Sequence, residues 1–206
     1  MRRIKPPLFI LCLTPAAWLI WRGLHQDLGA NPIELITHST GDWTLRFLVI
    51  TLAITPLRKL SGRTELIRFR RMLGLFAFFY GCLHLLTYVW LDKFFDVAGM
   101  IHDIGKRSFI TAGFAGFLLM APLAITSTAG WIRRLGGRRW QRLHRLIYAC
   151  AVAGVVHYWW LVKSDIRNPL AYAVIVGLLL AYRASAKLYR SRISAPVCGN
   201  SIPREV

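Results

Sequence analysis

The segments MLGLFAFFYGCLHLLTYVWL at 72–91 and LHRLIYACAVAGVVHYWWLV at 143–162 decide the fold. Each is long and apolar enough to cross a membrane, yet the first contains His84 and the second contains His144 and His157. An ionisable side chain in hydrocarbon is rare and usually functional, because its burial without a partner costs about 2 kcal/mol or more. Neutral imidazole in an apolar helical bundle is well suited to bind a metal, typically haem iron. The two segments therefore predict an all-α membrane protein that carries haem.

The composition supports a multi-pass membrane protein. Of the 206 residues, 55% are hydrophobic and only 17% are charged, whereas soluble domains are about 45–50% apolar. No loop between the apolar runs is long enough for a nucleotide-binding domain, so electrons from a nucleotide would have to arrive through another protein. The net charge of +18 lies in short clusters beside apolar segments. Such clusters are typical of the basic loops that set the orientation of membrane proteins. We therefore expect this chain to lie in a lipid membrane and to bind no nucleic acid.

Six segments are predicted to cross the membrane, since a span needs about 20 mainly apolar residues. They are residues 8–24, 43–60, 72–91, 108–126, 144–162 and 168–188. Residues 1–190 then form a single six-helix transmembrane domain, followed by a cytoplasmic tail at 191–206. The basic N-terminal segment is expected to remain as the first helix, because no clear small-residue cleavage site follows it.

The distribution of charge predicts the orientation of the spans. Twenty of the 27 Lys and Arg residues fall in the N-terminus, in the links between spans two and three and between spans four and five, and in the tail. Seven of the nine Asp and Glu residues fall in the remaining loops. Because basic loops stay in the cytoplasm, both termini are predicted to be cytoplasmic (N-in/C-in).

His84 and His157 are predicted to lie at similar depth in the outer half of the membrane. Both spans run outward, and His84 is 12 residues past Met72 while His157 is 13 residues past His144. These spacings place the two histidines about 18 and 19 Å above the inner ends of their helices. Their imidazoles would hold one six-coordinate haem for electron transfer. The chain has four cysteines and no CxxCH motif, so the haem is expected to be b-type.

His144 leaves several roles open. It lies at the inner boundary as a candidate ligand of a second haem, but the third span offers no second histidine opposite it. On an ideal helix His144 and His157 would also point about 140° apart. With Arg142 and Arg145 it could instead bind a haem propionate, a flavin phosphate or a quinone oxygen, or remain a plain interfacial histidine. The other three histidines are expected to be ordinary residues of outer loops: His25, His38 and His102.

Three stretches resemble the ferric-reductase-like transmembrane family: RRMLGLFAFFYGCLHLLTYVW (70–90), LAITSTAGWIRRLGGRRWQRLHRLIY (123–148) and VVHYWWLVKSD (155–165). The joined pattern W-x-x-LHRL-x-Y, followed by H-Y-x-W, is specific, and the likeness extends over about residues 5 to 190. The resemblance implies a multi-pass protein of the bacterial inner (plasma) membrane with b haem and flavin mononucleotide (FMN). It maps the functional histidines of the family onto His84, His144 and His157. Unlike the related NADPH oxidases, this chain has no fused flavin/NADPH domain, which supports an external electron donor.

The resemblance also implies partners. Similar proteins pass electrons from the quinone pool or a cytosolic flavin reductase to MsrP, a periplasmic molybdenum-containing reductase that repairs methionine sulfoxide in oxidised periplasmic proteins. The chain itself shows no candidate nucleophile or acid–base pair, so no catalytic residues are predicted and the substrate chemistry is expected on the partner. Two alternatives to this electron-transfer subunit remain. One is a self-contained transmembrane ferric reductase, and the other is a small transporter or metal-binding assembly factor whose histidines relay protons or bind a metal ion.

Overall fold

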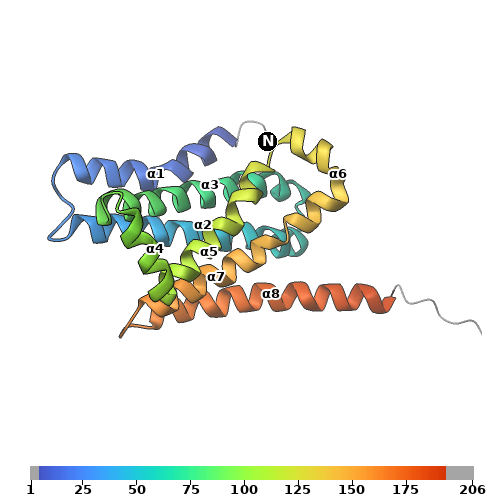
Figure 1. Ribbon diagram of the computed structural model, residues 1–206. Coiled ribbons are helices and arrows are strands. Elements are labelled where there is room, and N and C mark those ends of the chain that lie inside the picture. Colours follow the sequence, from blue (N-terminus) through green and yellow to red (C-terminus); the bar gives the residue numbers. More distant parts are fainter. Residues whose placement is uncertain (1–4, 194–206) are drawn as a thin grey trace, which may run out of the picture.

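A computed structural model describes residues 5–193, and every regular element in that range is helical (Figure 1). The prediction of an all-α fold is therefore confirmed for the described part of the chain. Residues 1–4 and 194–206 lie outside it, and with them most of the tail predicted at 191–206. The side chains of Lys187 and of residues 190–193 are likewise outside the description.

The helices and their bounds, in chain order, are α1 (Lys5–Leu24), α2 (Pro32–Ser61), the short 3-10 helix η2 (Thr64–Leu66), α3 (Ile67–Leu86), the π-helical η3 (Thr87–Asp92), α4 (Val97–Lys106), α5 (Ser108–Ile125), α6 (Ala129–Leu143), α7 (Leu146–Leu161) and α8 (Arg167–Ile193). Local signals explain both ends of α2. The Asn31 side chain accepts a hydrogen bond from the Glu34 N–H, and Pro32 follows it at a position where a missing N–H costs nothing. Gly62 ends the helix in the left-handed conformation (φ 68°).

Four described helical segments are long and apolar enough to cross a membrane: Lys5–Leu24, Thr64–Asp92, Ser108–Ile125 and Arg167–Ala186. They correspond to the first, third, fourth and sixth predicted spans. The fifth corresponds to α7, which is apolar but only 16 residues long. The second, predicted at 43–60, is the C-terminal part of the 30-residue helix α2, which carries Asp42 and Arg46 in its first half. The count of six spans therefore stays a prediction.

The chain turns between α6 and α7, and this turn corrects one prediction. His144 directly follows α6, and its N–H bonds to the Trp140 carbonyl (3.0 Å), whereas α7 begins only at Leu146. His144 and His157 therefore do not share a helix, and the angle expected between them on one helix does not apply. The turn consists of His144 and Arg145 and contains neither Gly nor Pro, so the sequence offered no helix-breaking residue there.

Two helix pairs form the centre of the bundle. α2 packs along α3 and α5 packs along α7, while α1 contacts α3 and α2, and α8 contacts α7 and α2. α1 and α8 thus cover opposite sides of the bundle (Figure 1). The interior is apolar and aromatic. Phe47 of α2 stacks on Phe76 and Tyr80 of α3, with ring centroids 5.7 and 5.4 Å apart.

The Tyr80 side chain links α3 to the turn of α1 that contains Pro15. Its side chain is fully buried, its hydroxyl donates to the Cys12 carbonyl (2.9 Å), and the same oxygen accepts from the Ala16 N–H (3.1 Å). Cys12 and Ala16 are the two ends of one helical turn, and Pro15 lies between them. A proline lacks an N–H and crowds the preceding turn. Tyr80 therefore satisfies backbone groups that no water could reach in the core.

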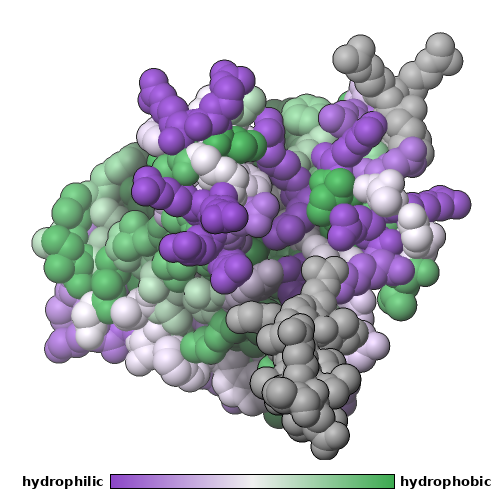
Figure 2. Space-filling view, turned by 90° about the vertical axis from the view of Figure 1, so that its right-hand side faces the viewer, coloured by the Kyte–Doolittle hydropathy of each residue, from purple (hydrophilic) through white to green (hydrophobic). Residues whose placement is uncertain are grey.

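The surface of the bundle is apolar along its length and polar at its ends. Several large apolar side chains are more than half exposed, among them Leu11, Trp18, Leu118 and Leu178, as expected for a surface that contacts lipid. One end of the bundle contains the C-terminus of α2, the N-termini of α3 and α7, the helix α6 and the C-terminal part of α8. We call it the basic end; it faces the viewer in Figure 2, where hydrophilic side chains gather. The opposite end is called the acidic end below.

Asp103 holds the acidic end together between η3 and α5. It is buried, and its carboxylate contacts Lys93 Nζ at 2.5 Å and Arg107 Nε at 3.3 Å while accepting a hydrogen bond from the Tyr88 hydroxyl at 3.2 Å. The Lys93 ammonium is the main reason that the pKa of the Asp103 carboxyl lies below its usual range. These contacts fix α4 and, directly after it, the first turn of α5.

Replacing Tyr80 by Phe should lower the free energy of unfolding by about 1–3 kcal/mol, because two buried backbone groups of α1 lose their partner. The measurement is thermal unfolding of the protein in mild detergent. Tyr182→Phe is the matched control, since the Tyr182 ring contacts Lys59 but its hydroxyl makes no hydrogen bond within the described residues. Equal effects of the two substitutions would contradict the role given to Tyr80.

Replacing Asp103 by Asn should destabilise the protein at pH 7 and cost progressively less in acid. A carboxyl whose folded pKa is depressed stabilises the fold above its unfolded pKa of about 4, and this contribution disappears as the pH falls through the folded value. Unfolding of both proteins between pH 7 and pH 3 checks this. Asp27→Asn, at an exposed pair with Arg22, should show almost no difference from the wild type. A gap between wild type and Asp103→Asn that widens in acid would contradict the prediction.

Candidate haem-binding site

The imidazoles of His84 and His157 meet in the interior of the bundle. His84 lies near the end of α3 and His157 near the end of α7, and their ring centroids are 5.9 Å apart with the ring planes at 79°. The expectation that these two histidines come together at matched depth is confirmed. That they bind haem iron stays a prediction, which the positions of the ring nitrogens can support or weaken.

His84 is oriented by the backbone of α2. Its Nδ1 lies 2.9 Å from the Thr37 carbonyl. One turn later stands Gly41, where a Cβ atom would come within 3.1 Å of Cε1 and 3.2 Å of Nδ1 of the ring. In a helix the carbonyl of residue 37 faces residue 41. The missing side chain at Gly41 therefore leaves the Thr37 carbonyl open to the imidazole.

His157 is held in the same way by α5. Its Nδ1 lies 2.6 Å from the Phe109 carbonyl. Gly113 stands one turn later, and a Cβ atom there would come within 2.7 Å of Nδ1 and 2.9 Å of Cε1. Real Cβ atoms essentially never approach so closely, so the ring occupies space that only glycine provides. The carbonyl and the glycine are four residues apart, as they are on α2.

These hydrogen bonds decide which nitrogen of each ring is available. A carbonyl can only accept, so Nδ1 carries the proton in both His84 and His157 and Nε2 keeps its lone pair. Neither Nε2 has a hydrogen-bond partner among the described residues. A metal-ligating histidine commonly donates its other N–H to a backbone carbonyl in this way, because the bond fixes the ring and its tautomer.

The pair fits haem better than a bare metal ion. Two imidazoles that bond one metal from opposite sides at about 2 Å have their centroids roughly 6 Å apart, and the centroids of His84 and His157 are 5.9 Å apart. Within residues 5–193 no group of three or more His, Cys, Asp or Glu side chains could hold an ion. Haem iron needs only two protein ligands, since the porphyrin supplies the other four.

His144 lies apart from this pair, at the basic end. Its ring stacks on Trp140 (centroids 3.8 Å apart) and its Nδ1 lies 3.1 Å from the Trp140 carbonyl. Its Nε2 is buried without a hydrogen bond. No other described histidine contacts it, so the structure brings no second ligand to a haem at His144. The role of His144 stays open.

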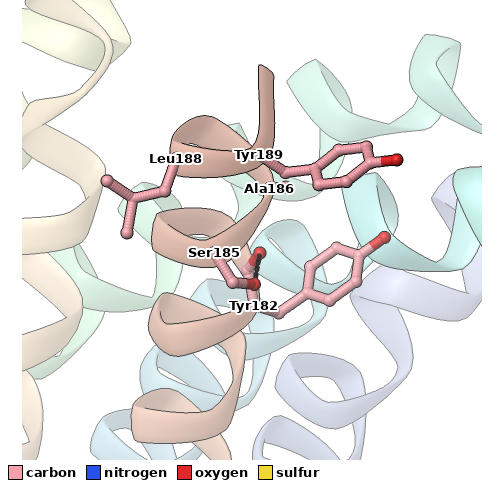
Figure 3. Close-up of a pocket in the computed structure, with 5 residues that line it drawn as sticks. All are labelled: Tyr182, Ser185, Ala186, Leu188 and Tyr189. Atoms are coloured by element: carbon pink, nitrogen blue, oxygen red, sulfur yellow. Dashed lines mark hydrogen bonds between the residues drawn. The ribbon is translucent and has the colours of Figure 1, made fainter. Parts of the chain in front are cut away.

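The three remaining histidines are exposed, but the prediction that they lie in loops holds only for His25, because His38 belongs to α2 and His102 to α4. His25 stacks on Trp21, and His38 lies 3.9 Å from Glu34. A shallow open hollow lies beside α8, lined by Tyr182, Ser185, Ala186, Leu188 and Tyr189 (Figure 3). All five residues come from one helix, so this hollow encloses nothing and contains none of the predicted site residues.

Sequence reasoning missed the backbone half of the site. Neither the Thr37 carbonyl nor Gly41 nor Gly113 is among the predicted site residues. In α2 and in α5 the glycine stands four residues after the residue whose carbonyl accepts the bond. This spacing can be read in the sequence, but it indicates a histidine contact only when the histidine that packs there is known.

Known proteins resemble this chain over most of its length. The family model described as "Ferric reductase like transmembrane component" matches residues 40–155, a range that contains His84 and His144 and ends two residues before His157. Three relatives are named "Protein-methionine-sulfoxide reductase heme-binding subunit MsrQ". The relative from Herminiimonas arsenicoxydans is 58% identical over 87% of this chain and 84% of its own length. Those from Azospira oryzae and Ralstonia nicotianae are 54% and 47% identical, each over 98% of this chain and over 86% and 94% of their own lengths. No solved structure matches the chain.

Placing a methyl group at Gly113 or Gly41 should weaken haem binding about 10- to 100-fold, the usual effect of losing a hydrogen bond that orients a metal ligand. Gly113→Ala should have the larger effect, because its Cβ meets the ring at the shorter distance. The measurement is haem retained per purified protein, read from the absorbance spectrum. Gly74→Ala is the control, since a Cβ there meets only ordinary contacts. Full haem content in Gly113→Ala would contradict the proposed orientation of His157.

Proposed function

The chain belongs to the ferric-reductase-like transmembrane family, among the MsrQ haem-binding subunits, and on this premise we propose that it transfers electrons across a membrane through b-type haem held by His84 and His157. The observation that supports this most directly is the geometry of the pair. Both imidazoles are fixed through Nδ1 on backbone carbonyls, both Nε2 atoms are unpaired, and the rings are spaced as two ligands of one iron.

The proposed chemistry is electron transfer alone. Bound haem supplies one-electron oxidation and reduction. His84 and His157 would hold and orient the haem, and with both imidazoles used as ligands the iron would offer no position to a substrate. We therefore propose no catalytic residue in this chain.

We propose that the bundle crosses the bacterial inner membrane six times, with the basic end in the cytoplasm. Four apolar helices, the shorter apolar α7 and the long α2 supply the six crossings. The clustering of Arg and Lys at the basic end supports the orientation by the positive-inside rule. His84 and His157 lie near the ends of α3 and α7 that reach toward the acidic end. In this orientation the haem lies toward the periplasm.

The immediate partners are proposed from the family. The names of the relatives describe a haem-binding subunit of a protein-methionine-sulfoxide reductase. We propose that this chain passes electrons to an MsrP-type periplasmic molybdenum-containing reductase, which carries out the repair of oxidised periplasmic proteins. Quinol or a cytosolic flavin reductase is the proposed donor. FMN, quinone and a second haem at His144 are further proposals from the same resemblance.

The experiment that tests this function is a reduced-minus-oxidised absorbance spectrum of the detergent-purified protein, with pyridine haemochrome quantitation. We expect a b-type spectrum that is lost in His84→Ala and in His157→Ala, because each substitution would remove one of the two imidazoles proposed to hold the haem. A partial loss in His144→Ala would add a second haem at the basic end. Protein without haem, after expression with ample haem supply, would contradict the proposal and favour the transporter or assembly factor.

The same reduced protein separates a transfer subunit from a self-contained ferric reductase. Its haem should be reoxidised quickly by the purified periplasmic reductase with methionine sulfoxide, and only slowly by a ferric chelate alone. Rapid oxidation by the chelate without any partner would favour the ferric reductase.

A further inference from the structure

The link between η3 and α5 exposes large apolar side chains at the acidic end. Within a stretch of eight residues, the exposed fractions are 76, 60, 61 and 66% for Phe94, Phe95, Val97 and Ile101. Such a patch marks contact with a membrane or with another protein. The backbone is a second sign, because Phe94 and Phe95 have positive φ angles of 48° and 62°. Bulky residues rarely adopt this left-handed conformation, and strain of this kind is kept where a segment has a function.

The exposed side of α4 is amphipathic. Val97 and Ile101 are exposed and stand one helical turn apart, so they form an apolar stripe. His102 and Lys106 are also exposed and one turn apart, and they form a polar stripe about 140° around the helix from the first. Asp103 is buried and marks the side of α4 that faces the bundle. A helix with these two exposed stripes fits the boundary between hydrocarbon and water.

The ends of two candidate spans hold this link at the membrane boundary. One span ends at Asp92 and the next begins at Ser108. Two residues of extended chain reach at most about 7 Å, and the headgroup region on each side of the hydrocarbon is about 5–7 Å thick. Phe94 follows Asp92 by two residues, so its position is at the level of the lipid headgroups.

Asp103 holds the middle of α4 at the same level. Its carboxylate contacts Lys93, next to the end of one span, at 2.5 Å and Arg107, next to the start of the other, at 3.3 Å. In Figure 1 α4 accordingly lies at a steep angle to α3 and α8. The helix therefore runs across the spans and does not continue one of them away from the membrane.

We propose that residues 93–107 form a membrane anchor at the acidic end. The side chains that enter the lipid headgroup region are Phe94, Phe95, Val97 and Ile101. Their burial among lipid is favourable and offsets the strain of the two left-handed phenylalanines. Lipid suits the patch better than a docked protein, because the two spans hold the patch at the level that lipid already occupies. The anchor goes beyond electron transfer and rests only on the membrane location of the chain.

The anchor is also connected to the histidine pair. The Thr111 hydroxyl of α5 donates a hydrogen bond to the Ile104 carbonyl of α4. Phe109, in the same turn of α5, provides the carbonyl that lies 2.6 Å from Nδ1 of His157. A helix α4 that is seated in lipid therefore steadies the turn that orients His157.

The test measures how deep each stripe of α4 lies in phosphatidylcholine nanodiscs. Ile101→Cys, on the apolar stripe, and His102→Cys, on the polar stripe, each carry a nitroxide spin label. Cys82→Ala and Cys198→Ala remove competing thiols, and the other two cysteines are buried. Collisions of the label with oxygen, which concentrates in lipid, and with a water-soluble nickel complex are read by electron paramagnetic resonance.

We expect the label at Ile101 to collide several times more often with oxygen, and several times less often with nickel, than the label at His102. Phe94→Gly combined with Phe95→Gly should raise the nickel collisions at Ile101. Glycine accepts the left-handed backbone without strain, so only the loss of the aromatic rings can cause this change. Gln26→Gly is the matched control, because Gln26 is exposed and also has a positive φ (55°). It should leave the collisions unchanged.

Three outcomes overturn the anchor. Frequent nickel collisions at both positions would place α4 in water. If these collisions fell only after the purified periplasmic reductase was added, the patch would be a protein docking surface. Unchanged collisions at Ile101 after the double glycine substitution would show that the phenylalanines do not hold α4 in place.

Two further measurements keep the test decisive. Val97→Cys and Lys106→Cys, one turn away on the same stripes, repeat the comparison if a first label position prevents folding. The haem spectrum is recorded on the same samples. Absent haem with the expected collisions would be a failure of the proposed function and not of the anchor.

Discussion

The bundle depends on backbone carbonyls that proline and glycine expose and that side chains of a neighbouring helix then bind. In hydrocarbon no water is present to satisfy a carbonyl, so each exposed one needs a partner within the protein. Proline exposes a carbonyl by removing an N–H, and Arg183 binds the Leu52 carbonyl that Pro56 leaves. Glycine exposes a carbonyl by removing a side chain, and His157 binds the Phe109 carbonyl beside Gly113. Each such bond joins two helices that are distant in the sequence.

The same bonds prepare the site. His84 is fixed within the pair α2 and α3, and His157 within the pair α5 and α7. Each pair therefore positions one ring by itself, and the packing of α2 on α7 and of α3 on α5 brings the two rings together. Helix packing already restricts each imidazole. The entropy cost of ordering the two rings is therefore not subtracted from the free energy of ligand binding. A haem held by these two imidazoles would find both rings already oriented and with Nε2 free of a proton.

Much of this fold could be predicted from the sequence, because apolar length and charge clustering are local properties. The apolar runs located the helices that now contain His84 and His157, and helical rise placed these residues at matched depth. The break after α6 could be placed only approximately: span five is predicted to begin at 144, whereas His144 and Arg145 form the turn and neither is a helix breaker. The roles of Gly41 and Pro56 could not be predicted either. Each depends on which side chain of another helix faces it, and that is a property of packing.

The two ends of the bundle differ in how their charged side chains are paired. At the acidic end Asp103 is surrounded by Lys93, Arg107 and Tyr88, and its charge is fully compensated. At the basic end Arg70 and Arg183 have no ion-pair partner among the described residues, and Arg183 Nε makes no hydrogen bond. In the proposed orientation this end lies in the cytoplasm, where water solvates the exposed basic side chains. The buried Asp103 instead finds its partners within the protein, at the end of the bundle that α3 and α7 approach near His84 and His157.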